Sequence, residues 1–332
     1  MPLAIALLVA LGVAKLALLG TQGLEQFGVT HVLYLDLVLV LPVAGLALLV
    51  AARGRQGVRL AGMAMLLLAP VGAYASFVEP ERLVVERARV GLPEARAGHD
   101  RVEVAVLADL QFREVGDLQR EAVERATRSR PDVILVPGDI HQGSQASLRR
   151  ELPEIRTLLT GLRARGGVYF AVGDAEGVRK ARRLLSGTGV RLLHNRVAHV
   201  GVGDRQVTIG GTERDWRSPG ARRSIGRLER DPSPRDVRIL MTHRPDSVLT
   251  LRRNTRVDLV VSGHTHGGQV QLPFFGPPFD ASGVPREVGA GGLHRLGGRR
   301  RIYVSRGIGM ERGQAPRVRF RAAPELSLLS LR

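Results

Sequence analysis

Two histidines stand one residue apart directly after a predicted strand. The apolar run 257–261 is typical of a buried strand, and Gly263 ends it just before His264 and His266. On an extended backbone, residues two positions apart point to the same side. Both imidazoles could therefore reach one ligand at the carboxyl edge of a sheet, where α/β folds place their sites. Taken alone, the pair also fits two surface histidines in a turn.

Four other predicted strands also end in a carboxylate or an imidazole. The residues at these ends are Asp109, Asp139, Asp174 and His243. A single aspartate after a strand is usually a helix cap or a turn residue, but that explanation does not account for a whole series of such ends. Oxygen and imidazole ligands without sulfur suit Mn, Fe or Zn. Two such ions about 3.5–4 Å apart can clamp a phosphate ester and activate a water.

The elements that would position these residues alternate between strand and helix. Predicted strands 102–108, 132–136 and 168–172 are separated and followed by predicted helices 117–130, 147–165 and 176–186, the first of them capped by Asp117. This repeat indicates an α/β sheet with parallel strands at its centre. The later part is richer in strands and indicates a second sheet, with strands at 207–210, 238–241, 257–261, 302–305, 318–321 and 326–331. Residues 297–301 are predicted to form a hairpin tip or a loop.

Three apolar segments precede this region, at 3–20, 32–52 and 60–78. Each is close to the roughly 20 residues that cross a bilayer. Lys15 makes the first segment the weakest, so we predict three spans with two as the alternative. The chain then divides into a membrane region at 1–78, a tether with a first strand at 79–101, and a globular domain at 102–332.

Arginines between the second and third segments orient the predicted spans. Arg53, Arg55 and Arg59 crowd this short loop, and the positive-inside rule places it in the cytoplasm. The third span would then deliver the globular domain to the outside of the membrane. The arginines that follow the third segment argue in the other direction; they are Arg82, Arg87, Arg89 and Arg96.

The composition excludes several classes of chemistry and of binding partner. The chain has no cysteine, which excludes disulfides and thiolate chemistry. Its formal charge is +18, but the arginines are spread over every segment and aromatic residues make up only 4%. A nucleic-acid-binding domain needs a clustered basic stripe, and single strands need aromatic platforms. We therefore expect no nucleic-acid partner.

The order of the site residues resembles that of the calcineurin-like metallophosphoesterases over residues 102–332. The strings GHTHGGQVQLP at 263–273 and LMTHRPD at 240–246, with the tail at 302–309 and 324–331, resemble the bacterial branch with N-terminal membrane segments. The resemblance implies a two-sheet β-sandwich flanked by helices (α-β-β-α), preceded by transmembrane helices. It also implies two divalent metal ions (Mn, Fe or Zn) and hydrolysis of a phosphate mono- or diester by a water that the metals activate. The bacterial branch further implies a location in the inner membrane, and the arginine pattern places the catalytic domain on the extracytoplasmic side. The membrane anchor suggests a lipid-linked substrate such as a phospholipid or a lipid precursor.

The resemblance also implies a role for each strand-end residue. Asp109 and His266 would hold the first metal, His243 and His264 the second, and Asp139 would bridge both. Asp174 stands where the family has asparagine and can still reach the second metal.

This chain departs from the family pattern at three positions. Gln111 replaces a histidine ligand, and Asp174-Ala175 replaces Asn-His. Ala175 cannot donate a proton, and the loss of a general acid lowers rates by roughly 10²–10⁴. His141 or Glu176 could act in its place, as acid or ligand. The alternative is a degenerate domain with weak or no catalysis that binds ligands or acts as a scaffold.

Overall fold

The computed structural model describes residues 15, 17, 26–230, 233 and 235–332. The chain forms two units, and each is described by itself. The larger unit comprises Glu79–Met310 and Arg319–Arg332, and the smaller comprises Met1–Val78 and Glu311–Val318.

The larger unit contains a first sheet of six strands in the order β1-β12-β2-β3-β4-β5. Strands β2 to β5 run parallel, and β12 pairs parallel with β1 but antiparallel with β2. The strands are β1 (Val84–Val90), β2 (Val102–Val106), β3 (Val133–Val136), β4 (Val168–Phe170), β5 (Arg191–Leu192) and β12 (Glu325–Leu331). The predicted parallel centre is therefore present in this sheet.

A second sheet of six strands has the order β10-β11-β9-β8-β7-β6. Its four central strands are parallel, and β10 and β6 pair antiparallel at the two edges. The strands are β6 (Arg196–Val202), β7 (Arg205–Gly211), β8 (Val237–Met241), β9 (Leu259–Ser262), β10 (Gly292–Arg295) and β11 (Arg301–Val304). β10 and β11 form a hairpin, which places residues 297–301 at its tip and at the start of β11 as predicted.

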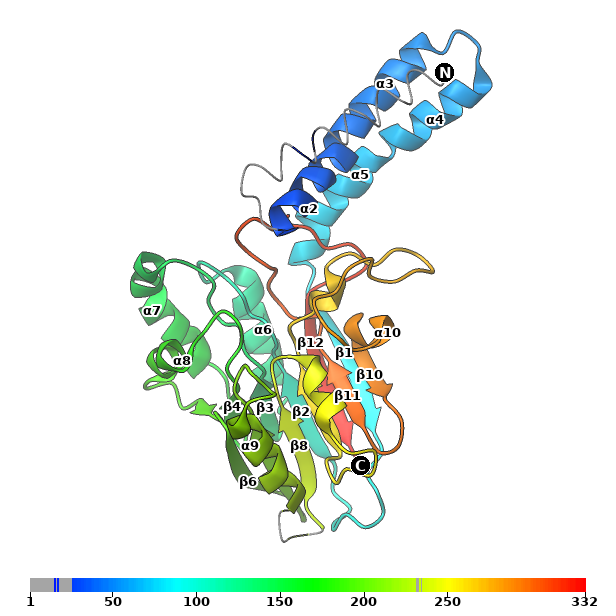
Figure 1. Ribbon diagram of the computed structural model, residues 1–332. Helices are drawn as coiled ribbons and strands as arrows, with labels where there is room; N and C mark the ends of the chain where they lie inside the picture. The colour runs from blue at the N-terminus through cyan, green and yellow to red at the C-terminus, as the bar shows by residue number, and fades with distance from the viewer. Residues whose placement is uncertain (1–14, 16, 18–25, 231–232, 234) are drawn as a thin grey trace. The chain divides into compact units, whose positions relative to one another are not determined.

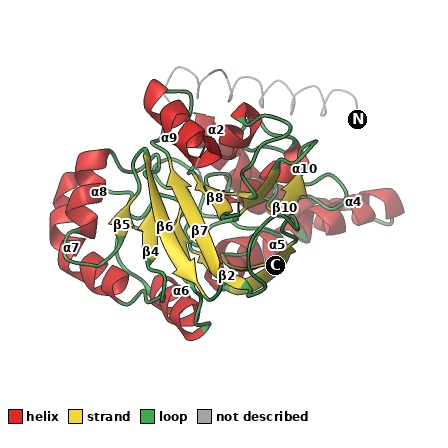
Figure 2. Ribbon diagram, turned by 90° about the horizontal axis from the view of Figure 1, so that it is seen from below, coloured by secondary structure: helices red, strands yellow, loops and turns green. Residues whose placement is uncertain are grey.

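Alternating apolar residues divide the core into three layers. Val104 of β2 and Leu259 of β9 pack between the two sheets. Ala105 faces the opposite way, toward helices α6 (Asp117–Arg128), α7 (Gln145–Thr160) and α8 (Val178–Leu185). Val260 faces the outer side of the second sheet, with α9 (Pro219–Arg230) and α10 (Arg286–Gly289). Figures 1 and 2 show α6, α7 and α8 grouped beside the first sheet. The predicted α-β-β-α architecture is thus confirmed.

Two local predictions differ from the structure. Residues 318–321 form no regular strand; only Phe320 makes a single bridge, with Val270. The reason is Arg319, whose buried guanidinium donates to the carbonyls of Arg306 and Gly307 at 3.0 and 3.2 Å and so holds the segment in a loop. The first helix is capped by Gly116 rather than Asp117, which is its first helical residue.

Two helical runs are long and apolar enough to cross a membrane, Phe27–Ala51 and Gln56–Glu81; both lie in the smaller unit except for residues 79–81 of the second. The first run is formed by α2 (Gln26–Leu35), η1 (Asp36–Val40) and α3 (Leu41–Ala51). The second is formed by α4 (Gln56–Leu66), α5 (Leu68–Ala73), η2 (Tyr74–Val78) and η3 (Glu79–Glu81). They approach closely at two glycines, because a Cβ on Gly45 would lie 2.6 Å from the carbonyl oxygen of Gly62. The predicted segment 3–20 lies outside the described residues, apart from positions 15 and 17.

Candidate metal centre

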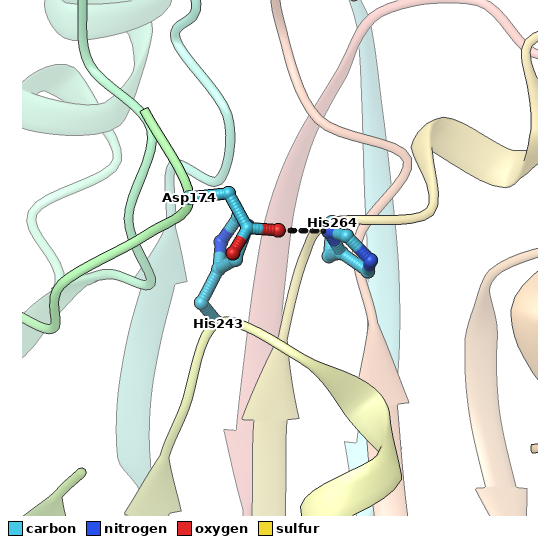
Figure 3. Close-up of side chains that lie close together, drawn as sticks. All are labelled: Asp174, His243 and His264. Atoms are coloured by element: carbon cyan, nitrogen blue, oxygen red, sulfur yellow. Dashed lines mark ion pairs between the residues drawn. The ribbon is translucent and has the colours of Figure 1, made fainter. Parts of the chain in front are cut away.

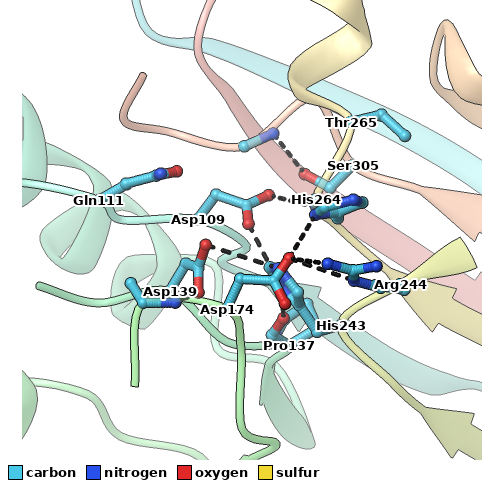
Figure 4. A network of polar contacts seen from close by, with 12 residues as sticks. Asp109, Gln111, Pro137, Asp139, Asp174, His243, Arg244, His264, Thr265 and Ser305 are labelled. Atoms are coloured by element: carbon cyan, nitrogen blue, oxygen red, sulfur yellow. Dashed lines mark hydrogen bonds and ion pairs between the residues drawn. The ribbon is translucent and has the colours of Figure 1, made fainter. Parts of the chain in front are cut away.

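The carboxyl ends of strands from both sheets meet at one site. Asp109 follows β2, Asp139 follows β3 and Asp174 follows β4 in the first sheet, whereas His243 follows β8 and His264 follows β9 in the second. Figure 4 shows all five side chains converging on one region. The two-layer sandwich therefore brings together residues from distant parts of the sequence.

Several of these residues have left-handed backbone conformations. The φ angles are 46° at Asp109, 55° at Asp139 and 74° at His264, and Gln111 and His266 are also positive, at 32° and 51°. Such values are uncommon for residues other than glycine, and they cluster at functional sites. The turns are anchored between loops, since Asp109 N–H donates to Gly138 O at 3.2 Å and Gln111 N–H donates to Asp139 O at 2.9 Å.

The first group of potential ligands comprises Asp174, His243 and His264, shown in Figure 3. His264 Nδ1 lies 3.2 Å from Asp174 Oδ2, and His243 Nε2 lies 3.7 Å from the same oxygen. Arg244 Nη2 also contacts Asp174 Oδ2, at 2.7 Å. The three ligand atoms all lie within 4.8 Å of one another, close enough to surround one ion.

The second group comprises Asp109, Asp139 and His243, and all three are buried. His243 Nε2 lies 3.5 Å from Asp139 Oδ2, and its Nδ1 lies 3.6 Å from Asp109 Oδ1. Asp109 Oδ2 also accepts the His264 backbone N–H at 2.9 Å. His243 thus belongs to both groups.

Backbone carbonyls fix the tautomer of two of these imidazoles. His243 Nδ1 lies 2.8 Å from Pro137 O, and His264 Nε2 lies 3.0 Å from Ala281 O. A carbonyl oxygen can only accept a hydrogen bond, so these nitrogens carry the hydrogens. The other nitrogens, His243 Nε2 and His264 Nδ1, then present lone pairs to the carboxylates. Metal-ligating histidines are oriented in this way.

The charges at the site fit divalent cations. Burial lowers the pKa of His243, which keeps its imidazole neutral. Burial would raise the pKa of Asp174, but its close contacts with His264 and His243 and the two hydrogen bonds from Arg244 outweigh burial and hold this pKa well below its ordinary value. Lone pairs and carboxylate oxygens that face each other repel unless a cation lies between them. His243 Nε2 is buried and has no hydrogen-bond partner among the described residues, so its lone pair is available to such an ion.

His266 and Gln111 lie at the edge of this arrangement. His266 is buried, and its Nδ1 has no hydrogen-bond partner within the described part of the chain, but it is in neither group of three. Burial and the charge of Arg319 hold its pKa well below the ordinary value. Gln111 Nε2 donates to Gln142 Oε1 at 2.9 Å, and Figure 4 shows Gln111 apart from the cluster around His243. Metal ligation by these two residues stays a prediction.

Glu176 lies behind the metal centre and contacts the backbone. Its carboxylate accepts the N–H groups of Asp139 and His141, each at 3.1 Å, and that of Ile140. The side chain is fully buried, and burial together with the charge of Asp139 raises its pKa to about 8. These contacts hold the turn that carries Asp139, a role that the sequence pattern did not indicate.

His141 lies in the same turn, and Lys180 of α8 contacts it. His141 Nε2 lies 3.3 Å from Ser147 Oγ, and burial and the charge of Lys180 lower its pKa to about 4. Lys180 Nζ donates to the carbonyls of His141 and Ala175 at 2.6 and 3.0 Å. No sequence pattern indicated Lys180; the only available signal was that it is one of two lysines in the chain.

Comparisons with known proteins identify related sequences. The family model described as calcineurin-like phosphoesterase matches residues 102–268. The metallophosphoesterase YkuE of Bacillus subtilis is 27% identical over 271 residues, which cover 78% of this chain and 89% of YkuE. The phosphodiesterase YaeI of Escherichia coli is 26% identical over 268 residues, covering 78% and 92%.

One further relative is matched over less than half of its length, and one solved structure has a low sequence identity to this chain. The metallophosphoesterase F40B5.2 of Caenorhabditis elegans is 28% identical over 221 residues, but the match spans only 43% of its length. A solved dimetal phosphatase from Danio rerio is 15% identical, with a TM-score of 0.40 over 63% of this chain and 88% of that one. The match of the family model to about half of the chain, from β2 through the His264-Thr-His266 turn, shows that the chain belongs to the calcineurin-like phosphoesterase family.

Proposed function

We propose that this chain is a membrane-anchored, metal-dependent phosphoesterase that hydrolyses a phosphate mono- or diester. The observation that carries the proposal is the orientation of His243 and His264. Each has one ring nitrogen tied to a backbone carbonyl and the other directed at the carboxylates. Two hydrogen bonds to backbone carbonyls thus orient the lone pairs of both imidazoles toward the carboxylates. This orientation suits ion binding better than a structural role.

In this proposal Asp109, Asp139 and His266 hold one divalent ion, and Asp174, His243 and His264 hold the other, with Asp139 between them. Two such ions would supply Lewis-acid stabilisation of phosphoryl oxygens and lower the pKa of a water. The protein positions these groups through the turns that follow its strands. Arg244 holds Asp174 in place with two hydrogen bonds, at 2.7 and 3.1 Å.

An apolar loop beside the site supports a lipid-linked substrate, such as a phospholipid or a lipid precursor. The loop follows His266 directly, and its Ala281 carbonyl contacts His264. Four large apolar side chains are exposed on it, and Phe274 is entirely open to solvent; they are Leu272, Phe274, Phe275 and Phe279. Exposed aromatic clusters of this kind are typical of surfaces that contact membranes or partners.

The two apolar helical runs support the membrane anchor. Arg53 and Arg55 lie in the short link between Phe27–Ala51 and Gln56–Glu81, and Arg59 lies near the start of α4. The positive-inside rule then places this link in the cytoplasm and the catalytic domain on the extracytoplasmic side of a bacterial inner membrane. Residues 3–20 would provide a third span.

The proposal is tested on the full-length protein in detergent by elemental analysis and hydrolysis of p-nitrophenyl phosphate and its diester. We expect about two Mn, Fe or Zn ions per chain and turnover that His264→Ala abolishes. The matched control is His99→Ala, because His99 is exposed and belongs to neither group of ligands. Absence of both metal and turnover with every divalent ion would refute the enzyme assignment.

A second test addresses the lipid-linked substrate. The double variant Phe274→Ser/Phe275→Ser should hydrolyse a phospholipid in vesicles more slowly but p-nitrophenyl phosphate at the wild-type rate. Equal rates on both substrates would remove the support that the apolar loop gives.

The alternative is a degenerate, ligand-binding member of the family. Ala175 favours it, because this residue offers no proton to a leaving group. Bound metal without turnover on any phosphate ester would support this alternative.

A further inference from the structure

A cavity of about 780 Å³ lies between the beginnings of α7 and α8, beside the metal centre. Gly143 and Gln145 line it from the α7 side, and Arg179, Lys180 and Arg183 line it from α8. Its volume is within the range of small-molecule sites. None of the residues assigned above to metal binding contributes to its lining.

The lining of this cavity is strongly basic. It includes three cationic side chains and no carboxylate. Arg179 and Arg183 are exposed, and neither has an acidic side chain within 4.0 Å in the described part of the chain. The charge of Lys180 is partly offset by Glu176 and Asp139, which lie nearby. The two arginines therefore give the cavity a net positive charge that the protein does not neutralise.

The cavity shares a wall with the metal centre. Ala175 lines the cavity, and its backbone N–H donates to Asp139 Oδ1 at 2.7 Å. Lys180 Nζ donates to the carbonyls of Ala175 and His141, so the same lysine joins the cavity to the turn that carries Asp139. An anionic ligand in the cavity would thus lie next to a phosphate ester at the metals.

We propose that this cavity binds a second phosphate group of the substrate, so that the enzyme acts on diphosphates or bisphosphates. This inference rests on the proposed phosphoesterase function. Arginine forms paired, charge-assisted hydrogen bonds with phosphate oxygens, and two unpaired arginines in one cavity suit that ligand.

The binding test uses full-length, metal-free protein in detergent and inorganic pyrophosphate, at low ionic strength. Equilibrium dialysis of labelled pyrophosphate should show binding to the wild type. The double variant Arg179→Ala/Arg183→Ala should bind about tenfold or more weakly, because it loses two charged donors. The control is Arg182→Ala, which removes the same charge from the same helix at a residue that does not line the cavity; we expect an affinity within about twofold of the wild type.

Equal affinity of the wild type, the double variant and the control, or no binding to the wild type, would overturn the proposal. Hydrolysis of p-nitrophenyl phosphate, which has a single phosphate, is measured in parallel with metal present. The double variant should retain the wild-type rate, and a loss as large as that of His264→Ala would also count against a separate second site. Because the binding test needs no turnover, an inactive wild type refutes the proposed function without affecting this result.

Discussion

Replacement of Glu176 by alanine tests whether this buried carboxylate holds the turn that carries Asp139. The carboxylate accepts three backbone N–H groups, from Asp139, Ile140 and His141. A buried donor without a partner costs about 1–3 kcal/mol. Water that enters the space left by the carboxylate recovers part of this loss, so we take the low end for each donor. The free energy of unfolding should then fall by roughly 3 kcal/mol.

The measurement is urea unfolding of the metal-free protein in detergent, followed by the fluorescence of Trp216, the single tryptophan of the chain. Glu176→Gln keeps one acceptor oxygen and should lose about half as much stability. The control is Glu154→Ala, an exposed residue paired with Arg120 at 3.1 Å, which should change stability by less than about 0.5 kcal/mol. If Glu176→Ala unfolds at the same urea concentration as Glu154→Ala, the carboxylate does not hold this turn.

Three further variants test other parts of the structure. Arg319→Met removes a fully buried guanidinium that donates to several carbonyls, and it should lower the free energy of unfolding by about 3 kcal/mol or more. The control Arg321→Met changes an exposed residue and should not lower it. Equal unfolding midpoints of the two variants would contradict this prediction. Asp174→Ala removes one ligand from the group with His243 and His264, so elemental analysis should find fewer ions per chain than in the wild type; an unchanged count would place the second ion elsewhere. Ala175→His combined with Gln111→His should raise the turnover of p-nitrophenyl phosphate by up to about 10²-fold if a general acid is missing, and an unchanged rate would show that another acid is already in place.

Most of the fold was predictable because short stretches of sequence indicate its strands and helices. Valines and isoleucines alternate between two apolar surfaces in β2, β3, β8 and β9, and these short runs are separated by amphipathic helices. The alternation of apolar residues is weaker in the strands that were not predicted. β6 contains His199 and Gly201 and lies at an edge of its sheet, and β10 contains Gly292 and His294 at the opposite edge. Edge strands need less apolar sequence, so periodicity indicates them poorly.

The candidate site was predictable in its strand-end residues but not in its supports. Asp109, Asp139, Asp174, His243 and His264 could be selected because parallel strands place their carboxyl ends together. The contacts of Glu176 and Lys180 with backbone groups depend on how α8 packs against the turn after β3. Sequence patterns reveal which side chains could do chemistry, but a bond from a side chain to a distant backbone group leaves no periodic signal.

The position of β12 has a consequence for how the domain is made. This strand lies between β1 and β2, although it is synthesised after all the other strands of both sheets. Until residues Glu325–Leu331 emerge from the ribosome, β1 has no partner in the first sheet and β2 has an open edge. Long-range pairing of this kind delays folding. The first sheet therefore cannot be completed until this last segment has been translated.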